Sequence, residues 1–197
     1  MSRSFLLLMD AMRQANRQLS RLSRQKMSLK VVGGRVVSLP EVTGAIGPAD
    51  IRMCAVIAGL YFDQPDRPEM RFILAVDQAA LAPLAAAVLG TGFDTGPAMA
   101  RSMLQEFGNV GASAIANHLS SRMDARVHIS APDVIEDTLE SLANATIGSF
   151  LNPEDNIPVL QTELRMDGRT YTGSALLLID RDVDQAECLI SGSVKGI

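Results

Sequence analysis

The chain has 197 residues, of which 47% are hydrophobic and 20% are charged, and its formal net charge is -4. This composition is typical of a folded globular protein, and the length favours one compact domain spanning residues 1–197. The sequence pI is near 5.2 and no concentrated block of Lys and Arg stands out. Both argue against nucleic acid as a partner, because neutralised phosphates supply most of the affinity in such complexes.

The cysteines and histidines do not form a metal-binding pattern. Cys54 and Cys188 have no CxxC partner, and two histidines are too few for a usual zinc site, so we expect no bound metal. The apolar run over residues 5–9 is far shorter than a membrane span, and no cleavage site follows it. We therefore expect a cytoplasmic protein that does not insert into a membrane.

The first half of the chain predicts a helix followed by strands. Apolar side chains recur at helical intervals from Leu8 to Leu22, which predicts one amphipathic helix over residues 3–28. Beyond Gly33-Gly34 we expect extended segments at residues 35–39, 52–62 and 70–76, the last two joined as a hairpin by turn-prone residues 63–66. An Ala- and Leu-rich helix over residues 78–89 follows and stops at Gly90.

The second half repeats this order. Pro97 suits the first turn of a strong helix over residues 98–121, and alternation around Val127 and Ile129 predicts a strand over 125–131. A helix over 134–150 and a hairpin of 159–166 with 170–179 complete the chain. The order helix, strand, hairpin thus occurs twice, over about 3–76 and 98–180. We predict an α+β (α/β) fold, a duplicated pseudo-symmetric unit whose mostly antiparallel sheet is backed by helices.

The helix over residues 98–121 has one polar face and one apolar face. Its polar stripe consists of Ser102, Glu106, Asn109, Ser113, Asn117 and Ser120. The opposite arc is apolar, with Gly108 and Gly111 where only a small residue permits close packing. A polar stripe is usually just a solvated helix face. Here Glu106 is its one charged member, and Ser and Asn are poor helix formers, so we interpret the stripe as a functional surface.

This helix and the strand after it resemble the signature of a known protein family. The segment reads SMLQEFGNVGASAIANHLSSRMDARVHISAPDV, in which Ser102-x3-Glu106-x2-Asn109 is followed after 22 residues by Pro132. The pattern is similar to that of the chemotaxis phosphatases of the CheC, CheX and FliY group, and closest to CheC. The layout of residues 5–180, including the closing hairpin, resembles the same group.

The resemblance implies a protein aspartyl-phosphate phosphatase that acts on the receiver domain of a CheY-like response regulator. Asn109 would position the attacking water, Glu106 would contact a receiver lysine, and Ser102 and Ser113 would contact the partner. Mg²⁺ would be carried by the receiver, so this chain would need no cofactor of its own. The residue types suit this role, because phosphoryl transfer depends on positioning and a carboxamide can both donate to and accept from a water.

The first half contains a degenerate counterpart of the motif. Counting back from Pro40 by the same spacing places the other positions at Asp10, Gln14 and Arg17. Gln14 is not acidic, and the guanidinium of Arg17 cannot accept a hydrogen bond from a water. We therefore expect residues 102–132 to form the single catalytic centre.

Other readings of the sequence are a non-catalytic adaptor and a small-molecule sensor. An adaptor of the same fold would bind a receiver, a CheD-like protein or a motor-switch component without turnover, and fold alone does not exclude it. The pair of Glu106 and Asn109 argues against it, since an adaptor has no need of that pair. A sensor would need a ligand pocket, which the sequence does not identify. The absence of GxSxG and HExxH motifs argues against a conventional hydrolase.

Overall fold

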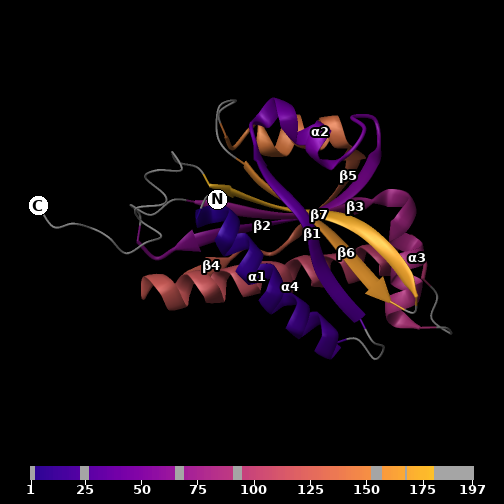
Figure 1. Ribbon diagram of the computed structural model, residues 1–197, viewed down its shortest axis with the longest axis horizontal. Helices are drawn as coiled ribbons and strands as arrows, with labels where there is room; N and C mark the ends of the chain where they lie inside the picture. Colours follow the sequence, from indigo (N-terminus) through magenta and orange to yellow (C-terminus); the bar gives the residue numbers. More distant parts are fainter. Residues whose placement is uncertain are drawn as a thin grey trace, which may run out of the picture.

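The computed structural model describes residues 3–22, 27–64, 69–90, 95–151, 157–166 and 168–179. Figure 1 shows a central sheet with long helices on one side and short helical segments on the other. In chain order the elements are α1 (Arg3–Leu22), β1 (Met27–Val37), η1 (Leu39–Glu41), α2 (Val42–Ile46), β2 (Arg52–Phe62), β3 (Met70–Asp77), α3 (Gln78–Leu89), α4 (Pro97–Met123), β4 (Val127–Ile129), β5 (Asp133–Thr138), α5 (Leu139–Leu142), η2 (Ala143–Ile147), β6 (Ile157–Met166) and β7 (Arg169–Ile179).

The strands form one antiparallel sheet in which the two halves of the chain are interlocked. The strand order is β1-β6-β7-β3-β2, and β4 and β5 both pair with the outer side of β2. The first strand of each half therefore pairs with the hairpin of the other half, and the two hairpins meet at β3 and β7. The predicted α+β class and mostly antiparallel sheet are confirmed, and the strand order is symmetric about the β3–β7 pair.

A hydrophobic core lies on each face of the sheet. The larger one packs α1, α3 and α4 against one face, around the fully buried Phe72, Leu104 and Ile115. The smaller one packs α2, α5 and η2 against the other face. Side chains alternate between faces along each strand, so β2 contributes Val56 to the first core and Ala55 to the second. Both faces of the sheet are covered, and α4 is the long helix of the first layer (Figure 1).

Two glycines let α4 lie close to the sheet, as the sequence predicted. A Cβ atom at Gly111 would lie 2.6 Å from Cε1 of Phe72, and one at Gly108 would collide with the side chain of Val56. Real Cβ atoms do not approach other heavy atoms so closely, so only glycine permits this packing distance. The sheet thereby holds the middle of α4, where Glu106 and Asn109 are found.

The start of the chain differs from the prediction in the length of its helix. α1 ends at Leu22, and Met27 and Ser28 already pair with β6 in strand β1. Gly33-Gly34 does not precede the strand but lies inside it, beside a register shift between Val31 and Gly33. Glycine in a strand often marks such a bulge. The predicted helix over residues 3–28 was therefore wrong at residues 27 and 28, because pairing with β6 determines the structure there. Residues 23–26 of that prediction lie outside the described residues.

The segment after α4 also differs from the prediction. Residues 133–138 form β5, although a helix was predicted from residue 134, and the helical part is limited to α5 and η2. β5 pairs with β2 from Arg52↔Thr138 to Ile57↔Asp133. The Thr138 hydroxyl accepts a hydrogen bond from the Ser141 backbone N–H at 3.2 Å, which caps α5 and marks where the helix begins. The other predicted helices and strands agree with the structure to within a few residues.

Candidate functional site

The polar stripe predicted on α4 is on the outer side of that helix. Ser102 and Glu106 are exposed, while Asn109 and Ser113 are partly buried. The side chains of Glu106 and Asn109 make no hydrogen bond or ion pair within the described part of the chain, and the two residues lie about one turn apart. Both can therefore reach a partner that docks on this face of α4.

The rear of α4 is held rigidly by the first core. Leu104 and Ile115 are fully buried, and Phe107 and Val110, which flank the motif residues, are also buried. A helix packed along its length against a sheet presents side chains from a fixed backbone. Asn109 is partly buried and so lies at the boundary between core and solvent.

The N-terminal turns of α4 are tied to the edge of the sheet by a charged pair. The Arg101 side chain, next to Ser102 in sequence, donates from Nε to Glu136 Oε1 and from Nη2 to Oε2 at 2.9 Å. Gln78 Nε2 donates to the same carboxylate at 3.1 Å. The hydrogen bond and charge of the Arg101 guanidinium lower the pKa of Glu136 below its ordinary value. β5 thus fixes one end of the candidate site.

A second link joins the helix to the turn that contains Pro132. Gln105 Nε2 donates to the carbonyl oxygen of Pro132 at 2.7 Å. Pro132 lies between β4 and β5, where Leu60 pairs with Ile129 and Ile57 pairs with Asp133. From Leu60 to Ile57 the chain advances by three residues, whereas from Ile129 to Asp133 it advances by four. The strand that contains Pro132 therefore has one extra residue at this point. Pro132 has no N–H to donate to the ladder, so this irregularity accommodates it.

The predicted degenerate positions on α1 have separate surroundings. Asp10 pairs with Arg13 at 3.1 Å and lies 4.0 Å from Arg122 of α4. Gln14 Nε2 lies 3.5 Å from Nδ1 of His118, also on α4. Asp10 and Gln14 thus face α4, whereas Arg17 lies beside strand β1. The structure does not bring these three side chains together as one site.

The strand register also contradicts the use of Pro40 as the counterpart of Pro132. Pro40 lies in η1, beyond the end of β1. The irregularity in β1 that corresponds to the one at Pro132 is at Val32, eight residues earlier in the chain. The frame counted back from Pro40 is therefore wrong, because the choice of Pro40 matched the residue type and not the position of the irregularity in the strand.

Sequence reasoning missed Arg101, Gln105 and Glu136 as supports of the site. Arg101 and Gln105 lie on α4 beside the motif residues, and Glu136 lies 35 residues after Arg101. A mixed-charge pair so far apart gives no local pattern. The segment of Glu136 was, moreover, predicted as helix, which would have removed its side chain from α4.

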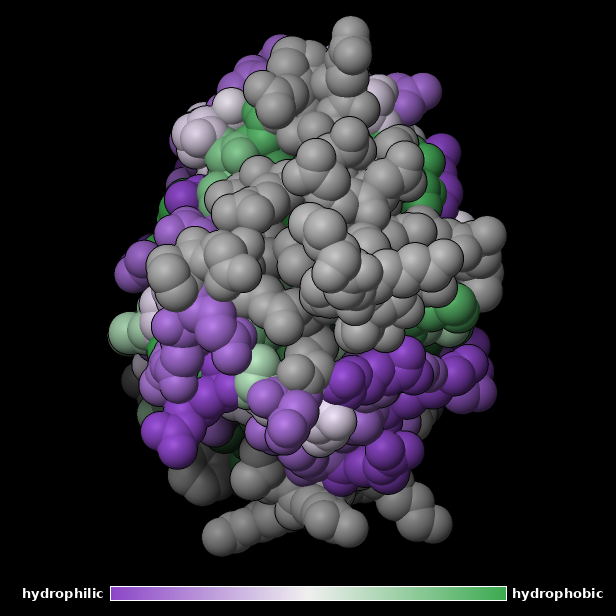
Figure 2. All heavy atoms as spheres, turned by 90° about the vertical axis from the view of Figure 1, so that its left-hand side faces the viewer, coloured by the Kyte–Doolittle hydropathy of each residue, from purple (hydrophilic) through white to green (hydrophobic). Residues whose placement is uncertain are grey.

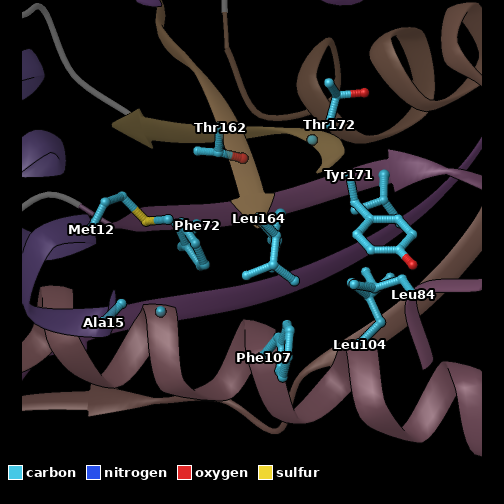
Figure 3. Close-up of a pocket in the computed structure, with 14 residues that line it drawn as sticks. Met12, Ala15, Phe72, Leu84, Leu104, Phe107, Thr162, Leu164, Tyr171 and Thr172 are labelled. Carbon is cyan, nitrogen blue, oxygen red and sulfur yellow. The ribbon is translucent and has the colours of Figure 1, made fainter. Parts of the chain in front are cut away.

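Among the described residues, the cavity found behind the polar stripe is small. Figure 3 shows the cavity between α1, α4 and the sheet, with Phe107 and Leu104 directed into it from α4 and Met12 from α1. Its volume is about 30 Å³, which is room for about one water. This space does not support the sensor reading.

One face of the molecule carries a group of hydrophilic residues. Figure 2 shows them over the lower part of the face on the left of Figure 1. No three His, Cys, Asp or Glu side chains among the described residues are grouped so that they could hold a metal ion. None of the described helices is both long and apolar enough to span a membrane.

Comparison with solved structures identifies known proteins that have the same fold. No family model matches the sequence, and no curated protein matches it. Solved structures, in contrast, match nearly the whole chain, and they include FliY, CheX and FliM proteins. The chain therefore has the fold of the CheC, CheX and FliY group, and the resemblance seen in the sequence is confirmed at this level.

Three of these structures illustrate the range of proteins that have this fold. FliY from Thermotoga maritima is 17% identical with a TM-score of 0.67, and the match covers 95% of this chain and 94% of FliY. CheX from Borrelia burgdorferi, in complex with CheY, BeF3 and Mg²⁺, is 16% identical with a TM-score of 0.55, covering 92% and 100%. A FliG–FliM complex from H. pylori is 12% identical with a TM-score of 0.58, covering 89% and 91%. At these identities the likeness is one of fold.

Proposed function

We propose that this chain removes the phosphoryl group from the phosphorylated aspartate of a CheY-like receiver domain in the cytoplasm. One observation carries the proposal: Glu106 and Asn109 lie about one turn apart on the outer side of a helix that the sheet holds rigidly, and neither side chain is engaged by the described residues. A protein of the same fold, CheX, has been solved with CheY.

The chemistry needs a positioned water more than a strong base. In the proposed reaction a water oxygen attacks phosphorus while the bond to the aspartate oxygen breaks, which yields inorganic phosphate and a free carboxylate. The transition state is loose, so alignment of the water supplies much of the rate enhancement. The Asn109 carboxamide can accept a hydrogen bond from that water and donate one to it, and its neutrality avoids repulsion of the phosphoryl oxygens.

Glu106 would fix the register of docking. Its carboxylate would pair with a lysine of the receiver, and a charge-assisted hydrogen bond is shorter and stronger than a neutral one. Ser102 and Ser113, one turn to either side of the pair, would contact the partner. Mg²⁺ would arrive with the receiver, where it neutralises charge on the phosphoryl group.

The test is the rate of phosphate loss from a panel of phosphorylated receivers with Asn109→Ala. We expect the variant to fold and to bind the receiver, yet to lose about 100-fold or more of the acceleration. Asn144→Ala is the matched control, since it removes the same side chain at an exposed position of η2, on the other face of the sheet. Near-normal turnover by a folded Asn109→Ala protein would overturn the assignment of the catalytic group.

The second candidate function is a non-catalytic adaptor. FliM shares this fold and has been solved in complex with FliG, so the fold also serves protein assembly. An adaptor could engage a receiver, a CheD-like protein or a motor-switch component. Tight receiver binding by the parent chain with no acceleration of phosphate loss, for any receiver in the panel, would favour this function.

A further inference from the structure

Strand β1 forms an edge of the sheet and exposes apolar side chains. Within the described part of the chain β1 pairs with β6 alone, so the other side of its backbone has no strand partner. Val32 is 51% exposed and Val36 is 38% exposed. An edge strand offers a row of N–H and C=O groups to any extended chain that lies beside it.

A groove runs along the same strand, between β1 and α1. It encloses about 400 Å³, and its floor is apolar, formed by Met9, Met12 and Val31. Three cationic residues line it: Arg13 and Arg17 from α1, and Lys30 from the outer strand β1, all of them exposed. None of the described residues that line it is acidic. Arg13 pairs with Asp10, while Arg17 and Lys30 form no ion pair with any other described residue.

The charge of the surrounding sequence differs in sign from that of the whole chain. Residues 13–30 contain six cationic residues and no Asp or Glu, although the chain carries a net charge of -4. The six are Arg13, Arg17, Arg21, Arg24, Lys26 and Lys30. They are spaced along the segment rather than contiguous, so the whole-chain average conceals them.

We propose that this groove binds an extended acidic peptide segment of a partner protein, which adds to β1 as a further strand. Main-chain hydrogen bonds to the β1 edge would supply affinity for any extended peptide. The cations along α1 and at Lys30 would select acidic side chains, and the apolar floor would receive apolar ones. This surface is separate from the Glu106 and Asn109 face and does not depend on the function proposed for it.

The charge argues against a second copy of the chain as the occupant. Two β1 strands paired edge to edge would bring Lys30 and the α1 arginines of one copy near those of the other, and like charges placed opposite one another are destabilising. A small anion such as phosphate would use the cations but neither the apolar floor nor the strand edge. Only a peptide uses all three features.

The experiment uses the full chain and a fluorescein-labelled octapeptide of alternating residues, Glu-Val-Glu-Thr-Glu-Val-Glu-Thr, with blocked termini. We expect binding that weakens with added salt and slowed hydrogen exchange of backbone amides in residues 30–36. Arg17→Glu with Lys30→Glu should weaken binding by about tenfold or more. The control is Arg126→Glu with Arg169→Glu, which makes the same change in net charge at exposed arginines outside the groove and should bind like the parent.

Two further probes separate strand addition from simple charge attraction. Peptides N-methylated at one or the other alternate set of residues lack main-chain donors on one side, so one of the two should bind about tenfold more weakly than the parent peptide. Equal binding by both methylated peptides, equal binding by the two double variants, or equally tight binding of a DNA duplex or anionic vesicles would overturn the proposal. Circular dichroism of each variant confirms that it is folded.

Discussion

The two central residues of the candidate site differ in their exposure to solvent. Asn109 is partly buried, next in sequence to the core residue Val110. Glu106 is exposed, and its longer side chain has no partner among the described residues. A partly buried amide suits the positioning of a water, and an exposed charged group suits the capture of a partner before docking is complete.

Replacing Glu106 with glutamine removes its charge and keeps the size of its side chain. We expect Glu106→Gln to weaken binding of a phosphorylated receiver by about three- to tenfold at low salt, because a charge-assisted contact becomes a neutral one. The difference between parent and variant should shrink as salt is raised. Fluorescence titration at several salt concentrations measures both effects. Glu140→Gln, at an exposed acid on α5, is the control, and identical salt dependence for all three proteins would contradict the role of Glu106.

At the scale of elements, the seating of α4 on the sheet is the feature that supports the site. Alanine at Gly111 would gain about 1 kcal/mol in helix propensity, but its Cβ would lie 2.6 Å from the buried Phe72 ring. Overpacking of a core costs about 1–3 kcal/mol, so we expect a net loss of stability for Gly111→Ala. Gly44→Ala, where no atom lies within 4 Å of the new Cβ, should instead gain up to about 1 kcal/mol. Urea denaturation measures both, and a stabilised Gly111→Ala protein would refute the packing account.

The contact between α1 and α4 predicts a dependence of stability on pH. Burial lowers the pKa of His118 below its ordinary value of 6.5, and the positive charge of Arg122 lowers it further. The negative charge of Asp10 opposes this shift by raising the pKa. His118 Nε2 is buried without a hydrogen-bond partner among the described residues. The unfolded chain therefore binds this proton more readily than the folded one, so stability is full above pH 6.5 and declines as the pH falls below it.

The pH effect is measured by urea denaturation of parent and His118→Gln proteins between pH 7.5 and 5. The variant should lose less stability over this range, because its amide does not titrate. His128→Gln, at the exposed histidine that pairs with Asp63, should keep the decline that is due to His118. Parallel curves for the parent and His118→Gln would show that His118 has the same pKa in the folded and unfolded chains.

For the whole molecule, the exchange of strands between the halves makes each half incomplete. β1 finds its pairing partner in β6, and β4 and β5 find theirs in β2. We expect fragments 1–90 and 91–197, produced separately, to show no cooperative thermal unfolding, because each lacks strand partners for its own first strand. Circular dichroism of each fragment and of their mixture measures this. A sigmoidal transition in either fragment alone would contradict the prediction of one domain over residues 1–197.

Elements with a strong local pattern could be predicted from the amino-acid sequence. The bounds of β2 and α3 agree with prediction to the residue, and the polar face of α4 and its close-packed glycines follow from helical periodicity alone. These features depend on neighbours within a few turns or one strand, which is the range that periodicity reports. The other features depend on contacts between segments that are far apart in the chain. β5 replaces a predicted helix because β2 supplies its pairing partner. The Arg101–Glu136 link joins segments 35 residues apart, and the irregularity of β1 lies at Val32, where pairing with β6 places it, and not at Pro40.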